Sequence, residues 1–187
     1  MKYIFEYASP LGKIFIESDG KFLTGLWFEY SFDEKKHAEN SAGEVKKLSA
    51  DSPDLPSVIF ETCRWLGVYF SGRNPDFTLE FRIENLTPFR KMVVDEMLKI
   101  PFGATMTYGE IAKNIAAKKG LEKMSAQAVG GAVGWNPICI VVPCHRVLGS
   151  NGSLTGYGGG IKNKIALLKT EGIDVEKFAL PKSRKFM

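Results

Sequence analysis

The chain has 187 residues and a mass of 20.7 kDa, with 44% hydrophobic and 12% aromatic residues. This length allows one large domain or two small ones, and the apolar content excludes a disordered chain. No apolar stretch is long enough for a membrane span, and the first residues do not resemble a signal peptide, so we expect a cytoplasmic protein without a membrane partner.

The net charge of +4 is divided unevenly along the chain. Residues 1–87 hold 10 Lys and Arg against 14 Asp and Glu, whereas residues 88–187 hold 15 against 7. A basic second half is typical of proteins that bind a polyanion such as nucleic acid, although lysines that merely solvate surface helices are a common alternative.

Cysteine and histidine are scarce. Three cysteines without a secretion signal indicate a reducing compartment. The two histidines are His37 and His145, and no Cys-x-x-Cys pair is present, so we do not expect a structural zinc site.

Short apolar runs separated by turn residues mark the first half as α/β. The predicted elements are an antiparallel meander of three strands, one amphipathic helix and a further strand, over residues 3–7, 13–17, 22–28, 58–70 and 77–81. The polar residues 31–56 are expected to form a loop with a short helix at 33–39.

The second half is mostly helical. A helix begins after Thr87 and ends before Pro101. Thr107 and Glu110 form the spacing of a capping box, which predicts a short helix to about residue 117. A helix of small residues follows over 125–133. These two helices are a helix-turn-helix candidate, a weak signal by itself; a last helix is predicted over 161–170.

The aliphatic run from Ile140 to Val142 predicts a buried strand that ends at Pro143. Cys144 and His145 follow at once. A thiol becomes a nucleophile when a neighbouring imidazole removes its proton, so Cys144 is the candidate nucleophile. Cys63 and Cys139 are interpreted as core residues without chemistry.

The segment Pro143-Cys144-His145-Arg146-Val147 closely resembles the active-site motif of the O6-alkylguanine-DNA alkyltransferases, also called methylated-DNA–protein-cysteine methyltransferases. Further matches flank it, among them Asn136-Pro137 and the capping-box segment with Tyr108. The resemblance is strong over residues 87–172 and loose over residues 1–86.

The resemblance implies a fold and a domain division. Residues 1–86 would form an α/β domain of the ribonuclease H-like kind. Residues 87–187 would form a mostly α-helical, winged-helix-like domain with the helix-turn-helix, which binds DNA and performs the transfer.

The same resemblance implies a single-turnover reaction without a metal or an organic cofactor, in which Cys144 takes the alkyl group from guanine O6 and is not regenerated. His145, oriented by Glu171, would remove the thiol proton through a water molecule. Asn136 would support the turn before the active site, and Arg146 would pack or pair between the two domains.

Four further residues are implied to bind the damaged base. Tyr108 and the amide of Gly158 would stabilise the charge on the leaving base, and the carbonyls of Val147 and Cys144 would accept its exocyclic amine. Tyr157 would form a wall of the pocket. The alternative for Tyr108 is an ordinary core tyrosine.

The implied partner is double-stranded DNA that carries O6-alkylguanine, bound by a monomer through the minor groove. The helix over 125–133 would enter the groove with Ser125, Gln127, Ala128 and Gly131, after which the damaged nucleotide is flipped out. Relatives commonly have arginine where this chain has Gln127, and we expect the glutamine to fill the vacated stack with a weaker hold.

Three alternatives belong to other classes of protein. A non-catalytic lesion-binding relative would carry tryptophan in place of Cys144. A regulator that senses alkylation would need an effector domain, for which 187 residues leave no room. A cysteine hydrolase would turn over and would not need a helix-turn-helix.

Overall fold

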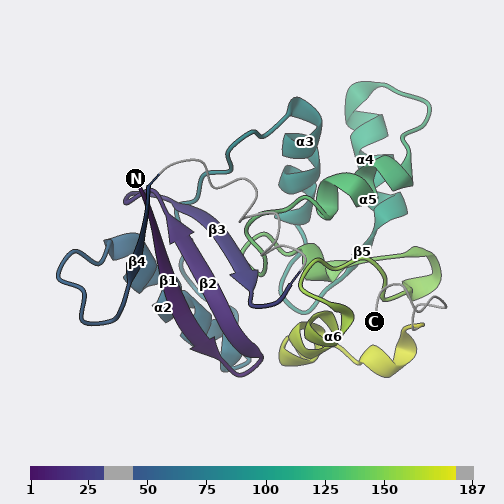
Figure 1. The fold of residues 1–187 in the computed structure, drawn as a ribbon. Helices are drawn as coiled ribbons and strands as arrows, with labels where there is room; N and C mark the ends of the chain where they lie inside the picture. The colour runs from purple at the N-terminus through teal and green to yellow at the C-terminus, as the bar shows by residue number, and fades with distance from the viewer. Residues whose placement is uncertain (32–43, 180–187) are drawn as a thin grey trace. The chain divides into compact units, whose positions relative to one another are not determined.

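The structure, a computed structural model, describes residues 1–31 and 44–179, so the helix expected at 33–39 and His37 lie outside the described residues. It divides into two compact units (Figure 1). Unit 1 consists of Met1–Glu84 with Pro137–Val141, and unit 2 of Asn85–Asn136 with Val142–Met187. The predicted domain division ran at residue 86 and did not foresee that residues 137–141 group with unit 1.

Unit 1 is built on a four-stranded sheet with the order β3-β2-β1-β4. The meander consists of β1 (Lys2–Ser9), β2 (Gly12–Ser18) and β3 (Leu23–Phe28), as the alternating sequence predicted. Strand β4 (Val45–Leu48) pairs parallel to β1, within the segment predicted to be a loop. Its sequence Val-Lys-Lys-Leu is mostly exposed and lacks the apolar alternation of a half-buried strand.

Strand β3 lies at the edge of the sheet and forms further backbone hydrogen bonds with two segments that are distant in the sequence. The sequence does not reveal this pairing. The strand predicted over 77–81 is wrong: that segment forms only an isolated bridge from Phe81 to Leu23. On the same strand, Leu26 donates its N–H to Pro137 O at 2.9 Å and accepts from Cys139 N at 2.9 Å. These two bonds explain why residues 137–141 belong to unit 1.

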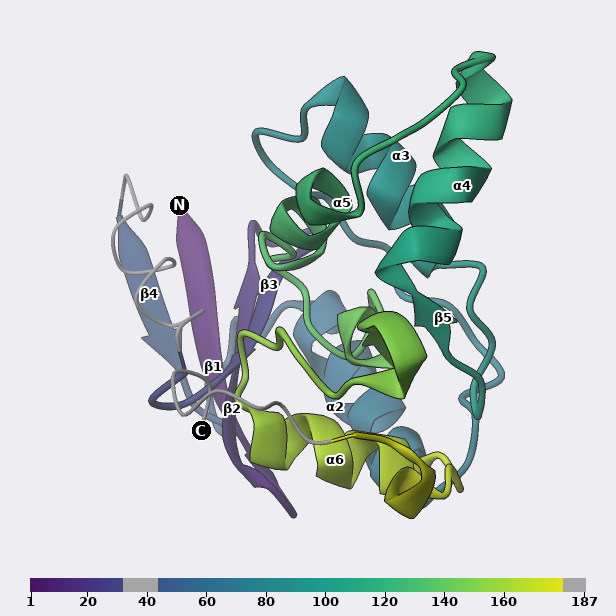
Figure 2. The same ribbon diagram turned by 90° about the vertical axis from the view of Figure 1, so that its right-hand side faces the viewer.

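Helix α2 (Ser57–Phe70) covers one face of the sheet in unit 1, as the figures show (Figures 1 and 2). Its predicted apolar face is confirmed, with buried Val58, Ile59, Thr62, Leu66 and Tyr69. Trp65 stacks on Tyr69 with ring centroids 5.5 Å apart.

Unit 2 contains three mutually packed helices, α3 (Pro88–Met97), α4 (Tyr108–Lys119) and α5 (Ala126–Val133) (Figure 2). Their starts follow the sequence signals closely. The side chain of Thr87 caps α3, and Thr107 and Glu110 form the predicted capping box of α4. Gly120, with φ +63°, ends α4 in the left-handed conformation that favours glycine.

The predicted strand over Ile140–Val142 is wrong in conformation, although these residues are largely buried. The chain makes tight turns instead, with Val141 N donating to Cys139 O at 2.7 Å and Cys144 N donating to Val142 O at 2.8 Å. Ile140 has φ +67°, which is rare for a β-branched residue. A short buried apolar run does not specify an extended backbone.

The segment after these turns positions the active-site motif in unit 2. A 3-10 helix, η1 (Cys144–Arg146), leads into β6 (Val147–Leu148), which pairs parallel to β5 (Met106–Thr107). Because β5 runs directly into α4, this pairing brings the start of α4 close to the motif.

Helix α6 (Ile161–Thr170) completes the described core of unit 2, after the short 3-10 turn η2 (Ser150–Gly152) and before the turn η3 (Val175–Lys177). Its Leu168 packs with Leu148 and Leu154 in a buried cluster. Within residues 1–31 and 44–179, no helix combines the length and apolar character needed to cross a membrane.

Candidate active site

Cys144 is buried at the start of η1, with 7% of its surface exposed. The side-chain amide of Asn136 donates to Cys144 Sγ at 3.1 Å and to the carbonyl of Val142 at 2.9 Å. Asn136 follows the end of α5, so this amide connects the helix end to the turn that carries the thiol. The structure therefore brings together Asn136 and Cys144, as the motif implied.

His145 and Arg146 both point to one carboxylate, that of Glu171 at the end of α6. His145 Nε2 lies 2.6 Å from Glu171 Oε1, and Arg146 Nε lies 2.9 Å from Oε2. The backbone N–H of Gly103 donates to Oε2 at 3.0 Å. Arg146 also donates to Ile100 O at 2.7 Å. Arg146 thus pairs with groups of its own unit, which corrects the expected role between domains.

The charges of this network are set by burial and by its ion pairs. Burial acts to raise the pKa of Glu171, but His145 and Arg146 outweigh it and lower that pKa to about 2. The pKa of His145 is lowered, mainly because burial disfavours the charged ring. The positive charges of Arg146 and Lys164 lower this pKa further, whereas Glu171 acts to raise it. A neutral ring that donates from Nε2 to an ionised carboxylate can accept a proton on Nδ1.

Tyr108 begins α4 and reaches the loop after β6. Its hydroxyl donates to Gly156 O at 3.1 Å and to Thr155 O at 3.3 Å. A Cβ at Gly156, where φ is +68°, would lie only 2.8 Å from this hydroxyl, so only glycine allows the approach. Burial, and then the charge of the Cys144 thiolate, raise the pKa of Tyr108 to about 12, which keeps the hydroxyl a proton donor.

Lys164 is a residue of the site that the sequence reasoning missed. Its side chain is fully buried in α6, and its ammonium donates to Val147 O at 2.6 Å and to Thr155 O at 2.8 Å. Burial lowers its pKa to about 8, with Cys144 acting in the opposite direction. Its position in the sequence could have indicated that it is buried, because Lys164 lies three residues after Ile161 and four before Leu168, on the apolar face of the helix.

The remaining residues expected at the base pocket lie along the same stretch of chain. Val147 is fully buried and offers its carbonyl to Lys164. The ring of Tyr157 stands edge-on to His145, with centroids 6.5 Å apart and an interplanar angle of 77°. Gly158, which is half-buried, follows it directly in the loop before α6.

The residues expected to contact DNA share the exposed part of α5. Ser125 caps the helix by accepting from Ala128 N at 3.2 Å, and Gln127, Ala128 and Gly131 are exposed. A Cβ at Gly130 would lie 3.9 Å from the ring of Tyr108, so the small residues of α5 are next to the start of α4.

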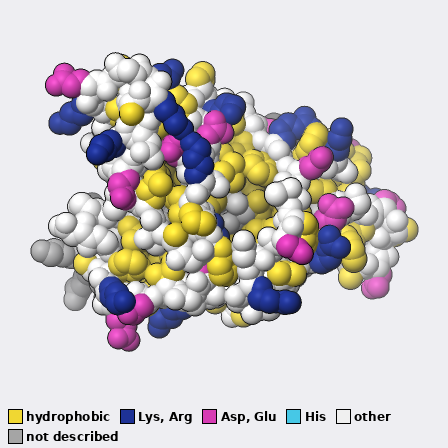
Figure 3. Space-filling view, turned by 180° about the vertical axis from the view of Figure 1, so that it is seen from behind, with side chains coloured by type: hydrophobic (Ala, Val, Ile, Leu, Met, Phe, Trp, Pro, Cys, Tyr) yellow, Lys and Arg dark blue, Asp and Glu magenta, His cyan; other side chains and the backbone are white. Residues whose placement is uncertain are grey.

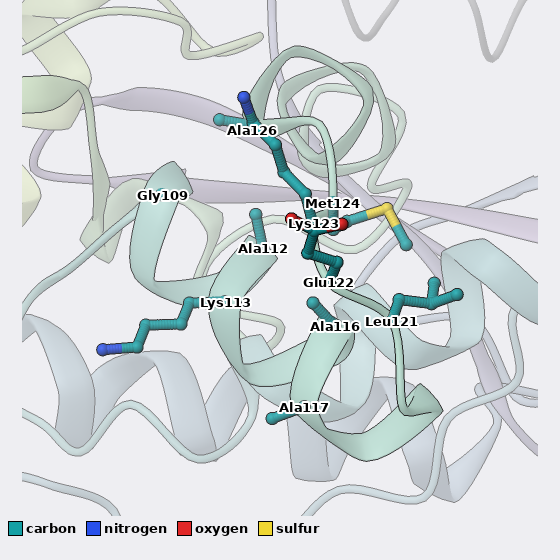
Figure 4. A pocket seen from close by; sticks show the side chains of 10 residues that line it. All are labelled: Gly109, Ala112, Lys113, Ala116, Ala117, Leu121, Glu122, Lys123, Met124 and Ala126. Atoms are coloured by element: carbon teal, nitrogen blue, oxygen red, sulfur yellow. The ribbon is translucent and has the colours of Figure 1, made fainter.

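A surface pocket of about 380 Å³ lies between α4 and the segment that leads to α5 (Figure 4). It is lined by small and apolar side chains together with Lys113, Glu122 and Lys123. The ammonium of Lys113 points away from it (Figure 4). Neither Cys144 nor its partners line this pocket, so it is not where the chemistry occurs. Among the described residues, no cluster of His, Cys, Asp and Glu could hold a metal ion.

Comparison with known proteins places the chain in a family. Residues 88–173 match the family model described as "6-O-methylguanine DNA methyltransferase, DNA binding domain". The methylated-DNA–protein-cysteine methyltransferase of Mycobacterium tuberculosis is 38% identical over 164 residues, which cover 87% of this chain and 88% of that protein. The protein of the same name from Methanosarcina acetivorans is 40% identical over 167 residues, which cover 89% of this chain and 96% of that protein.

The chain belongs to the methylated-DNA–protein-cysteine methyltransferase family. The fold agrees: the structure of Mycobacterium tuberculosis OGT in complex with DNA matches with a TM-score of 0.72 and 35% identity, covering 94% of each chain. The structure of the Pyrococcus kodakaraensis O6-methylguanine-DNA methyltransferase matches with a TM-score of 0.61 and 26% identity, covering 92% of this chain and 100% of that one. The chain binds DNA and repairs it directly, by transferring an alkyl group to a protein cysteine.

Proposed function

We propose that Cys144 is the cysteine that receives the alkyl group, and that O6-alkylguanine in duplex DNA is the donor. The observation that carries this proposal is the position of Cys144, with its sulfur 3.1 Å from the Asn136 amide and next in the chain to the His145–Glu171 pair. Cys63 lies in α2, where burial raises the pKa of its thiol to about 11, and Cys139 is buried in the same unit as Cys63.

The proposed reaction is one displacement at the alkyl carbon. Cys144 Sγ forms a bond to that carbon while the bond from carbon to guanine O6 breaks, and the electron pair of the broken bond stays on the base. The thiol proton passes through a water molecule to His145 Nδ1. The product is a thioether, which is a poor leaving group, so each molecule acts once and needs no cofactor.

Buried charge supports this division of roles. Glu171 is ionised, because its pKa is lowered to about 2, and can stabilise the imidazolium that forms when His145 takes the proton. Asn136 keeps the sulfur in place and offers its N–H to the developing thiolate.

We assign recognition of the base to Tyr108, Val147, Tyr157 and Gly158. In the structure Tyr108 donates to carbonyls of the pocket loop, and it would exchange these acceptors for the base when the nucleotide enters. Because a carbonyl oxygen has two lone pairs, Val147 can accept from the exocyclic amine while Lys164 stays bound. The amide of Gly158 and the hydroxyl of Tyr108 would stabilise the charge left on the base.

The exposed part of α5 is proposed to enter the minor groove. Its residues Ala128 and Gly131 are small enough for a close approach, and Gln127 is long enough to occupy the space of a flipped nucleotide. Ser125, at the cap, would contact the backbone of the DNA.

The finer description of the fold also stays a proposal. We propose a ribonuclease H-like first domain and a winged-helix-like second domain, with the division near residue 86, and a monomer as the active form. The packed helices α3, α4 and α5 with the short β5–β6 pair support the second assignment. The cytoplasmic location stays a prediction.

Substitution of the nucleophile tests the proposal. Cys144→Ala should lose all transfer of a labelled methyl group from duplex DNA and still bind the lesion, because only the sulfur is removed. Cys63→Ala and Cys139→Ala are the controls and should retain transfer. Transfer that persists without Cys144 would exclude it as the acceptor.

A further inference from the structure

The exposed part of α5 carries no charge of its own. Ser125, Gln127, Ala128 and Gly131 are all neutral. Neutralisation of phosphates by Lys and Arg supplies the non-specific affinity of a protein for DNA and a large share of the specific affinity. If α5 enters the groove, the cations must come from the elements packed beside it, above all from α3 and α4.

Three cations in α3, just after α3 and at the end of α4 are already paired. Lys91 binds Asp95 at 2.9 Å, and both Lys99 and Lys118 bind the buried carboxylate of Glu96. Arg90 differs: among the described residues, no carboxylate lies within ion-pair distance of its guanidinium. Seen from behind, the surface shows Lys and Arg side chains interspersed with Asp and Glu side chains (Figure 3).

Arg90 is held instead by an aromatic ring. Its guanidinium carbon lies 3.9 Å from the centroid of the Trp135 ring, and both side chains are half-buried. The backbone of Arg90 is fixed in the first turn of α3 by the Thr87 cap. Trp135 follows Gly134, the residue that ends α5, and precedes Asn136, which contacts the sulfur of Cys144. The pair thus stands at the end of α5 that leads to the nucleophile.

We propose that Arg90, stacked on Trp135, binds a backbone phosphate of duplex DNA at the end of α5. This inference rests on the proposed function of α5. A guanidinium whose face lies on an indole keeps its N–H groups at the edge, where they can donate to phosphate oxygens. The stacking also fixes the side chain before DNA arrives, which reduces the entropy that binding costs. The contact supplies a positive charge that Gln127 lacks.

The competing interpretation is that the pair only joins α3 to α5. Unit 1 offers a matched control, because Arg64 lies over the ring of Phe77 with its guanidinium carbon 4.2 Å from the centroid. Arg64→Gln removes the same charge from the same kind of pair, in the unit that does not contain α5. The thermal unfolding midpoint of each variant separates a loss of stability from a loss of DNA contact.

The test is the affinity for duplex DNA with O6-methylguanine, measured over a range of salt concentrations in proteins that also carry Cys144→Ala, which prevents transfer. Arg90→Gln should weaken binding about three- to fivefold, the range of one exposed ion pair. It should also reduce the slope of log affinity against log salt by about one. Arg64→Gln should change neither quantity. Arg90→Lys should keep the slope and bind more weakly than arginine.

Trp135 variants test the stacking itself. Trp135→Phe keeps a ring and should bind nearly as well as the parent, whereas Trp135→Ala should bind more weakly. In a protein that already carries Trp135→Ala, Arg90→Gln should reduce the affinity for DNA less than it does in the parent protein, because the two side chains act together. Equal salt slopes for Arg90→Gln, Arg64→Gln and the parent would overturn the proposal. A parent protein that does not bind the lesion duplex, or a wild type that accepts no alkyl group from it, would instead contradict the proposed function.

Discussion

Glu171 stays ionised in the core because His145 and Arg146 both contact its carboxylate. Burial alone would raise the pKa of its carboxyl, yet the contacts with His145 at 2.6 Å and Arg146 at 2.9 Å lower that pKa to about 2. The carboxylate is therefore ionised at neutral pH. Glu171 affects Cys144 indirectly, because it contacts His145, the proposed acceptor of the thiol proton.

Glu171→Gln should slow transfer from the free base O6-benzylguanine about a hundredfold, within the usual contribution of a general base. Without the anion, the imidazolium of His145 is less stable, so the thiolate forms at a higher pH and the pH–rate profile moves upward. Glu61→Gln, at an exposed position of α2, is the control. An unchanged profile would remove Glu171 from the network.

Lys164 holds two carbonyls of the base pocket with an ammonium whose pKa is lowered to about 8. Lys164→Met should slow transfer from the free base ten- to a hundredfold, because the pocket loop loses its anchor. In the wild type the rate should fall above about pH 8, as the ammonium loses its proton. Lys164→Arg keeps its charge at that pH and should lack this fall. Identical alkaline limbs in both proteins would assign the fall to another group.

The resemblance carried by the motif predicted most of these residues. Cys144, His145 and Arg146 are consecutive, and the structure brings Asn136 and Glu171 to them as implied. Lys164 was missed because lysine is usually a surface residue, even though its position in the helix is on the apolar face. Only the tertiary structure shows that two backbone carbonyls replace the carboxylate that such a lysine would otherwise need.

At the scale of the elements, local signals predicted the helices, but they predicted two strands that do not form and missed β4. The starts of α3 and α4 are encoded in the capping residues Thr87 and Thr107, whose partners lie three residues away. The segments 77–81 and 140–142 were predicted from residue type, but their conformation depends on distant partners or on consecutive tight turns. The pairing of 137–141 with Leu26 had no local signal at all.

Helix α5 carries the main departure from the family, Gln127. If this side chain fills the vacated stack, Gln127→Ala should slow repair in duplex DNA far more than transfer from O6-benzylguanine, which needs no flipping. Gln127→Arg should strengthen duplex binding by about 1 kcal/mol, because a guanidinium adds charge and stacking. Equal losses on both substrates in Gln127→Ala would mean that the residue supports the fold.

At the scale of the whole molecule, the uneven charge suits a protein that binds DNA through one part of its chain. Affinity for undamaged duplex DNA should fall steeply with salt and depend little on sequence, because phosphates rather than bases are neutralised. A titration of binding against salt concentration measures this dependence. A flat response would mean that the positive excess of residues 88–187 only solvates the surface.

The central claim is that one molecule accepts one alkyl group, on Cys144. Intact-mass analysis after incubation with excess duplex DNA containing O6-methylguanine, followed by peptide mapping, tests it most directly. We predict that every molecule gains a single methyl group, that the peptide containing Cys144 carries it, and that the reaction then stops. A methyl group on Cys63 or Cys139, or repair of more than one lesion per molecule, would contradict the account.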